Sequence, residues 1–339
     1  MSDPLSEGRM RASSAGSEDN CQSQPEVRYS VIITCYNQQE FIKDAVESVL
    51  SQECASKEVI VVDDGSQDRS LEILEQYGTF LQLLALPANC GVNEARNRGA
   101  AIARGKYLIF LDGDDLFTPW ALEVYECLIK EKQPCTILSS GRWFEGAVPV
   151  LQPADVPKRL EFVEYESLME RDRSAAMLIG AFVIDRRAFH DVGGWTPGMW
   201  HLDGQDLYLK LAYSGSAILV CSPYTLLYRM HAGNCIKRVS PYVQAARFMI
   251  NRERAGYYPG GRRKRFERYA RLGGWIHFCT KRLLLAGQYN GALRVMACGW
   301  PMILAAIFHK LIARLRGRRP VQIRELRPQE ALRPRGPDP

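Results

Sequence analysis

The sequence lacks the cysteine patterns of a zinc-binding or disulfide-stapled protein. Its ten cysteines include no CxxC pair and no Cys/His spacing typical of a zinc site. They are scattered through apolar segments, which is typical of reduced thiols buried as small hydrophobic side chains in a cytosolic protein. A structural zinc site and a disulfide framework are therefore excluded as the basis of the fold.

The sequence also has few long apolar runs of the kind found in signal peptides and membrane-spanning helices. Residues 1–27 are rich in Ser, Glu and Gly without an apolar run, which predicts a disordered leader instead of a signal peptide. The apolar stretch VMACGWPMILAAIF at 295–308 has 14 residues, whereas a spanning helix needs about 20. We therefore expect this stretch to be too short to cross a bilayer.

Acidic residues are few in the C-terminal third of the chain. The 339 residues carry a net charge of +6, but residues 1–240 have 23 basic and 33 acidic side chains, and residues 241–339 have 21 and 5. With 46% hydrophobic and 24% charged residues, the composition is that of a soluble globular protein. An acidic domain joined to a basic extension points to an anionic partner.

The basic extension has two interpretations. The stretch 295–308, with Trp300 and flanking Arg residues, is typical of an interfacial anchor on an anionic membrane leaflet. Alternatively, it belongs to a helical hairpin that packs on the preceding domain or on a second subunit. No nucleic-acid partner is expected, because no nucleic-acid-binding module accompanies the charge.

Between residues 29 and 111, segments of strand and helix pattern alternate. This alternation predicts an α/β fold, with a mostly parallel sheet between layers of helices. The predicted strands are 29–35, 58–62, 81–86 and 107–111, and the predicted helices are 39–51, 69–77 and 93–103.

Polar clusters follow three of these strands. They are Tyr36-Asn37, the DDGS stretch at 63–66 and the DGDD stretch at 112–115. Ligands of parallel α/β sheets bind outside the carboxyl ends of the strands. Three carboxylates within four residues repel one another unless a cation lies among them, so 112–115 predicts a site for a divalent ion and substrate phosphates.

Five segments carry further motifs in a fixed order. They are VIITCYNQQEFIKDAVESVLSQ (31–52), VIVVDDGSQDRS (59–70), NCGVNEARNRGAAIARGKYLIFLDGDD (89–115), FVIDRRAFHDVGGW (182–195) and DGQDLYLKLAYSG (203–215). Together they resemble the family 2 glycosyltransferases, whose catalytic domain is the nucleotide-sugar-binding GT-A fold. The resemblance covers roughly residues 29–235.

The resemblance implies a domain organisation and a set of donor-binding residues. We expect a disordered leader (1–27), a GT-A catalytic domain (28–240), a basic helical extension (241–320) and a disordered tail (321–339). Asp64 is expected to bind the imide of the nucleotide base, and Asp112 is expected to contact the ribose. The full set of expected donor contacts is Tyr36, Asn37, Asp64, Asn93, Arg96, Asn97 and Asp112.

The same resemblance implies a metal site, an acceptor site and a general base. Asp112 and Asp114 form a DxD element expected to hold Mn²⁺ or Mg²⁺, with His231 as a further ligand. Trp195 is a candidate platform for an acceptor sugar. In the base motif this chain departs from the family pattern: one alignment puts Gly204 at the usual position of the base, and another puts Asp206 there. Asp206 is favoured as the base, with Asp203 as the alternative; a site without its base is the third alternative.

The implied activity is inverting, metal-dependent transfer of a sugar from a nucleoside diphosphate, with UDP as the default, to a glycan or lipid-linked acceptor. The expected setting is cell-surface polysaccharide synthesis, at the inner face of the cell membrane. Two other functions remain open. One is a non-catalytic sugar-nucleotide-binding or membrane scaffold protein, which the irregular acidic motif motivates. The other is a nucleotidyltransferase, although the first strand lacks the Gly-rich basic loop that would hold a triphosphate.

Overall fold

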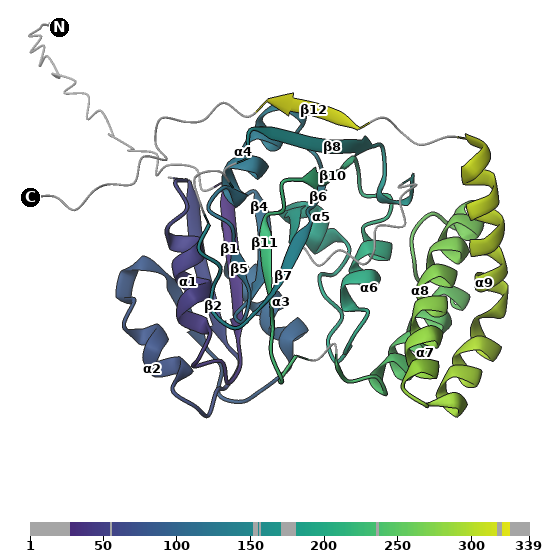
Figure 1. Ribbon diagram of the computed structural model, residues 1–339, viewed down its shortest axis with the longest axis horizontal. Coiled ribbons are helices and arrows are strands. Elements are labelled where there is room, and N and C mark those ends of the chain that lie inside the picture. Colours follow the sequence, from purple (N-terminus) through teal and green to yellow (C-terminus); the bar gives the residue numbers. More distant parts are fainter. Residues whose placement is uncertain are drawn as a thin grey trace, which may run out of the picture.

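The structure is a computed structural model that describes residues 28–54, 56–151, 155, 157–170, 181–234, 237–316 and 321–325. The leader 1–27 and residues 326–339 of the expected tail lie outside the described residues. The described residues form a large mixed sheet between helices, with a further layer of helices at one side (Figure 1).

The main sheet has nine strands in the order β12-β8-β10-β6-β9-β4-β1-β2-β3. Strands β4, β1, β2 and β3 run parallel, whereas β9 is antiparallel to both β4 and β6. The strands of this sheet are β1 (Tyr29–Cys35), β2 (Lys57–Asp63), β3 (Gln82–Ala85), β4 (Tyr107–Asp112), β6 (Thr136–Leu138), β8 (Arg159–Tyr165), β9 (Phe182–Asp185), β10 (Ala217–Ser222) and β12 (Gln322–Glu325).

A small second sheet, β5-β11-β7, lies beside the main one. Its strands are β5 (Leu116–Phe117), β7 (Gly141–Glu145) and β11 (Leu226–Met230). The helices are α1 (Ile42–Leu50), α2 (Ser70–Glu75), α3 (Val92–Ile102), α4 (Ala121–Lys132), α5 (Arg186–Asp191), α6 (Asp203–Lys210), α7 (Pro241–Arg254), α8 (Arg265–Leu285) and α9 (Tyr289–Arg316).

The predicted alternation over residues 29–111 is confirmed, with boundaries that differ by up to three residues. The C-terminal strand differs from expectation, since β12 falls in the segment expected to be disordered. It pairs antiparallel with β8 (Figure 1). A strand of four residues with Arg324 and Glu325 at its end has too little apolar content to be read from composition.

The core is divided by the sheet into two apolar layers. Every residue of β1 is buried, and successive side chains enter opposite layers, as the two-residue period of a strand requires. Val31 and Ile33 pack with α1 and α4, whereas Ile32 packs with α3 and α6. Both faces of β1 are thus covered, which explains its continuous apolar sequence.

The three C-terminal helices α7, α8 and α9 form a layer beside α6 (Figure 1). Their buried residues join the same apolar cluster as α3 and α6. For example, the rings of Tyr208 in α6 and Trp275 in α8 meet edge to face at 5.7 Å. Of the two interpretations of the extension, packing on the preceding domain is therefore observed, while α9 remains at the outer edge of the molecule.

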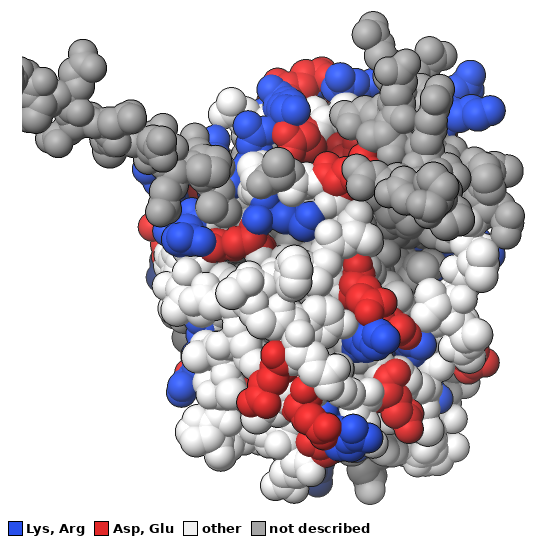
Figure 2. All heavy atoms as spheres, turned by 90° about the vertical axis from the view of Figure 1, so that its left-hand side faces the viewer, with Lys and Arg blue, Asp and Glu red and all other residues white. Residues whose placement is uncertain are grey.

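The face near α1 and α2 shows no patch of a single charge. Figure 2 shows acidic and basic side chains interspersed there, with uncharged surface between them. Within the part of the chain that the structure describes, the basic excess of the C-terminal region is not gathered on this face.

Close packing of α8 against α9 depends on Gly273. A Cβ at this position would overlap the carbonyl group of Met302, whereas a Cβ at the neighbouring Gly274 would meet nothing within 4 Å. We expect Gly273→Ala to lower the free energy of unfolding by about 1 to 3 kcal/mol, because the helices must separate. Urea denaturation measures this loss.

Gly274→Ala is the matched control for this prediction. It should raise the free energy of unfolding by about 0.5 to 1 kcal/mol, since alanine favours a helix interior and has open space here. Equal effects of the two substitutions would show that the α8–α9 contact is not as close as described.

Candidate active site

Three polar strand ends meet at one edge of the main sheet. Cys35 of β1 is in register with Asp63 of β2, and Thr34 of β1 is in register with Asp112 of β4. The residues that follow these strands therefore start from the same level of the sheet. This is the edge at which the sequence predicts a ligand site.

Asp112, Asp114 and Asp115 form an acidic cluster at this edge. Each offers a carboxylate oxygen within 4.8 Å of the others. Burial raises the pKa of Asp114, and the charge of Asp112 raises it further. Burial likewise raises the pKa of Asp115 well above its ordinary value, together with the charges of Asp114 and Asp112. Such a cluster of oxygen donors fits a hard divalent cation, which would relieve the repulsion.

His231 lies beside this cluster. Its Nε2 is 2.9 Å from Oδ2 of Asp114, and its ring packs 4.6 Å from the ring of Phe41. Arg229, on the same strand end, donates through its backbone N–H to Oδ1 of Asp115. The predicted proximity of His231 to the DxD element is therefore present in the geometry.

Arg96 connects the acidic cluster to a second carboxylate. Its guanidinium donates to Oδ1 of Asp112 at 2.6 Å and to Oδ2 of Asp203 at 2.8 Å. Burial lowers the pKa of Arg96, but the charges of Asp112 and Asp203 outweigh it and raise the pKa. One buried cation thus holds together the end of β4 and the start of α6.

A pocket of about 150 Å³ opens beside these charged groups. Arg96, Asp112, Asp115 and Asp203 line one part, and Trp195 and Phe182 line another. The pocket therefore combines converging polar groups with an aromatic wall, as small-molecule sites commonly do.

Trp195 is part of this wall but is not an open platform. It is 4% exposed, and the Arg96 guanidinium lies 4.5 Å from the centroid of its ring. Phe110 and Phe182 meet the ring nearly edge to face. Its Nε1 is buried and has no hydrogen-bond partner among the described residues. One ring face is thus already covered, which restricts stacking of a sugar.

Asn93 and Asn97 hold the loop that carries Trp195, and they do not line the pocket. The amide of Asn93 donates to the carbonyls of Thr196 and Met199, at 2.9 and 3.0 Å. Asn97 exchanges two hydrogen bonds with the backbone of Trp195. Both residues were expected at the donor; in the structure their amides bind the loop that covers this face of α3.

The glycine before Trp195 permits this close approach. Gly194 has a φ of +58°, and a Cβ there would lie 2.6 Å from Oδ1 of Asn97. This explains physically why a GGW sequence stands at the turn.

Asp64, expected to bind the base imide, lies at the loop before α3. It is 2% exposed, and its two oxygens accept hydrogen bonds from the backbone of Cys90 and Gly91. Asp64 therefore fixes the loop before α3. Tyr36 and Asn37 are exposed at the end of β1, and Oδ1 of Asn37 accepts a hydrogen bond from the backbone of Gln67.

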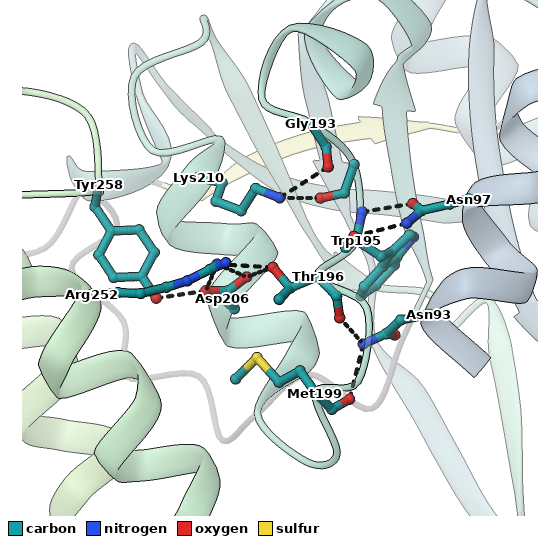
Figure 3. Close-up of polar contacts among 11 residues, drawn as sticks. Asn93, Asn97, Gly193, Trp195, Thr196, Met199, Asp206, Lys210, Arg252 and Tyr258 are labelled. Carbon is teal, nitrogen blue, oxygen red and sulfur yellow. Dashed lines mark hydrogen bonds and ion pairs between the residues drawn. The ribbon is translucent and has the colours of Figure 1, made fainter. Parts of the chain in front are cut away.

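The two candidate bases lie in different environments. Asp203 lines the pocket, whereas Asp206 is 1% exposed and is not among the pocket residues. The carboxylate of Asp206 is bound instead by Thr196, Arg252 and Tyr258 (Figure 3). Of the two candidate bases, Asp203 is therefore the one that lines this pocket, whereas the favoured Asp206 is enclosed by other side chains.

Arg252 and Tyr258 were missed by sequence reasoning. They follow the motif segments, and 46 and 52 residues separate them from Asp206. No motif or spacing in the sequence connects them. Only the basic character of the extension could have suggested that one of its arginines pairs with a buried carboxylate.

Comparisons with known proteins give consistent results. Residues 30–191 match the family described as Glycosyl transferase family 2. An uncharacterised glycosyltransferase of Haemophilus influenzae is 27% identical over 186 residues, which cover 54% of this chain and 61% of that protein. A poly-β-1,6-N-acetyl-D-glucosamine synthase of Staphylococcus epidermidis is 28% identical over 181 residues, which cover 50% of this chain and 42% of that protein.

The chain thus spans less than two thirds of the length of these relatives. Among solved structures, residues 1–349 of S. aureus TarS in complex with UDP-GlcNAc match with a TM-score of 0.53 and 17% identity. The match covers 85% of this chain and 92% of that chain. The expected GT-A fold, with its helical C-terminal region, is confirmed.

Proposed function

We propose that the chain, whose residues 30–191 match glycosyl transferase family 2, transfers a sugar from a nucleoside diphosphate to a hydroxyl group of a glycan or lipid-linked acceptor. The observation that carries this proposal is the pocket in which Asp112, Arg96 and Asp203 converge at the carboxyl end of β4. We assign the activity to cell-surface polysaccharide synthesis, a setting suggested by the named synthase among the relatives.

The proposed donor is a UDP sugar. UDP-GlcNAc is the ligand named for the TarS structure, and a second relative is named as an N-acetylglucosamine polymer synthase. On this basis we propose a hexosyl or N-acetylhexosaminyl donor. Tyr36 and Asn37, exposed at the end of β1, would contact the nucleotide base, and Asp112 would contact the ribose.

We propose that the acidic cluster holds Mn²⁺ or Mg²⁺. Asp114 and Asp112 would be ligands, and His231 would bind beside them; Asp115 is close enough to contribute. A bound ion would stabilise negative charge on the departing nucleoside diphosphate. Arg96, fixed between Asp112 and Asp203, would add positive charge on the same side of the pocket.

Asp203 is the proposed general base. Its carboxylate would take the proton of the acceptor hydroxyl while the hydroxyl oxygen attacks the anomeric carbon. The bond from that carbon to the diphosphate breaks, and the configuration inverts. Asp203 is held by Arg96 at the pocket, so it is oriented before substrate binds. Trp195 would restrict the acceptor side of the pocket by its edge.

The outer face of α9 is the proposed contact with the cell membrane. Tyr289–Ile312 is, among the described helices, the one long and apolar enough to cross a membrane by length and composition, with a mean hydropathy of 1.7. The expectation that residues 295–308 are too short to cross a bilayer was based only on the uncharged stretch, and the apolar part of α9 is longer than that stretch. Large apolar side chains are exposed at helical spacing: Leu293, Met296, Trp300, Leu304, Ile307, Phe308 and Leu311.

Two features favour a helix lying on the membrane over one crossing it. The opposite face of α9, including Val295 and Met302, is buried against the other helices, so only one face is free. Residues 268–324 also contain eleven Lys and Arg and no Asp or Glu. An apolar face with basic surroundings suits the inner, anionic leaflet, where a lipid-linked acceptor would be reached.

The donor and metal assignments predict a thermal shift. UDP with Mn²⁺ should raise the melting temperature of the wild type, since saturation about 100-fold above Kd stabilises by about 2.7 kcal/mol. Asp114→Asn should lose the Mn²⁺-dependent part of this shift. Asp191→Asn, at an exposed position in α5, is the matched control. A larger shift with GDP or dTDP would contradict the choice of UDP.

The base assignment predicts a loss of rate without a loss of donor binding. Asp203→Asn should lower the rate of UDP release from UDP-GlcNAc by about 10²- to 10⁴-fold, because the proton acceptor is removed. UDP binding, measured by calorimetry, should persist. A variant that keeps its rate, while Asp206→Asn loses it, would move the role of base to Asp206.

The membrane proposal predicts binding to anionic vesicles. Full-length protein should sediment with vesicles of phosphatidylcholine and phosphatidylglycerol, and less with phosphatidylcholine alone. The variant Leu304→Glu/Phe308→Glu should bind at least about tenfold more weakly, since each apolar side chain contributes about 1.5 to 3 kcal/mol. Phe80→Glu, at another exposed aromatic residue, is the control. If the variant instead loses a dimer that the wild type forms and keeps its vesicle binding, the outer face of α9 would be a contact with a second copy of the chain.

A further inference from the structure

Asp206 is the centre of a buried polar network that the reaction proposed above does not use. Its carboxylate accepts a hydrogen bond from Oγ1 of Thr196 at 2.6 Å and from the hydroxyl of Tyr258 at 2.6 Å. Arg252 donates to Oδ1 of Asp206 at 3.1 Å (Figure 3). The network thus joins α6, the loop after α5 and the C-terminal helices.

Arg252 of α7 is held in place from several sides. Besides Asp206, its Nη1 donates to Oγ1 of Thr196 at 2.9 Å. The rings of Phe248 and Tyr257 lie 4.4 and 4.1 Å from its guanidinium carbon. Since arginine loses little freedom when its planar group is packed in this way, Arg252 is a rigid contact.

The segment that Arg252 contacts adjoins two residues that line the pocket, Trp195 and Asp203. Thr196 directly follows Trp195, and the carbonyl of Thr196 is bound by Asn93 from the opposite side (Figure 3). Asp203 begins the helix in which Asp206 lies. The loop and the start of α6 are therefore held between α3 and α7.

Lys210 adds a second contact of the same kind. Its ammonium group reaches the carbonyls of Gly193 and Gly194, just before Trp195 (Figure 3). Burial lowers the pKa of Lys210. Asp206 and Lys210 lie four residues apart in α6, so this one helix fixes both ends of the turn that carries Trp195.

We propose that Arg252 is a positioning residue for glycosyl transfer: through Asp206 and Thr196 it fixes Asp203 and the Trp195 loop around the pocket. The inference rests on the proposed function. It assigns a role in the reaction to the C-terminal helices, which lie outside the matched residues 30–191. A buried ion pair is weak evidence for stability alone, because apolar side chains can replace it without loss.

The test is the rate of UDP release from UDP-GlcNAc in water, with Mn²⁺ present. Arg252→Met should lower kcat by about 10- to 100-fold, because small displacements of a catalytic group have effects of this size. The KM for UDP-GlcNAc should stay within about threefold, since the donor side is untouched. Arg252→Lys should recover part of kcat. Arg247→Met, at an exposed position of the same helix, is the matched control.

Misfolding is distinguished by a second variant and a second measurement. Arg252→Met/Asp206→Asn removes both charges, so no carboxylate is left buried without its cation. It should fold and still show the reduced kcat. Hydrogen exchange should be faster in residues 195–203 of the Arg252 variants and unchanged in β1 and β4.

The outcomes separate this inference from the proposed function. Absence of UDP binding and of UDP release in the wild type would overturn the proposed function. An active wild type with unchanged kcat and unchanged exchange at 195–203 in both Arg252 variants would overturn the role of Arg252. A parallel rise in KM and fall in kcat would also overturn it, because the effect would then be general.

Discussion

The arrangement of the site depends on how the carboxylates at the edge of the sheet are neutralised. Parallel strands bring Asp112, Asp114 and Asp115 together, and burial increases their mutual repulsion. Arg96 offsets part of that charge, and it does so by binding Asp112 and Asp203 at once. The two ion pairs of Arg96 thereby hold the start of α6 close to the end of β4, and the pocket lies between them.

Much of this edge could be predicted from the sequence, because its cause is local. A buried strand ends in polar residues, and parallel strands end at one edge, so Asp112, Asp114 and the end of β1 could be placed together before any coordinates were known. His231 could be placed only by its resemblance to a family motif. The structure brings it to Asp114 across 117 residues of chain.

The choice between Asp203 and Asp206 could not be made from spacing. Residues three apart on a helix are neighbours on its surface, so either could have faced the pocket. What separates them is their partners: Arg96 for Asp203, and Arg252 with Tyr258 for Asp206. Asn93 and Asn97 illustrate the same limit, since the loop that covers them follows about a hundred residues later. Contacts between segments that are far apart in the chain produce no spacing pattern in the sequence, so they could not be predicted from it.

The C-terminal helices have two distinct surfaces with different chemistry. Towards the sheet, α7 presents Arg252 to a buried carboxylate, and the α8–α9 pair closes the apolar core. Away from the sheet, α9 presents exposed apolar side chains in a segment without acidic residues. The helices α7, α8 and α9 pack on one another and on α6. A membrane bound to the outer face of α9 would therefore have a fixed orientation relative to the pocket. The same helical layer thus carries the basic, apolar outer surface and also supports the pocket through Arg252 and Asp206.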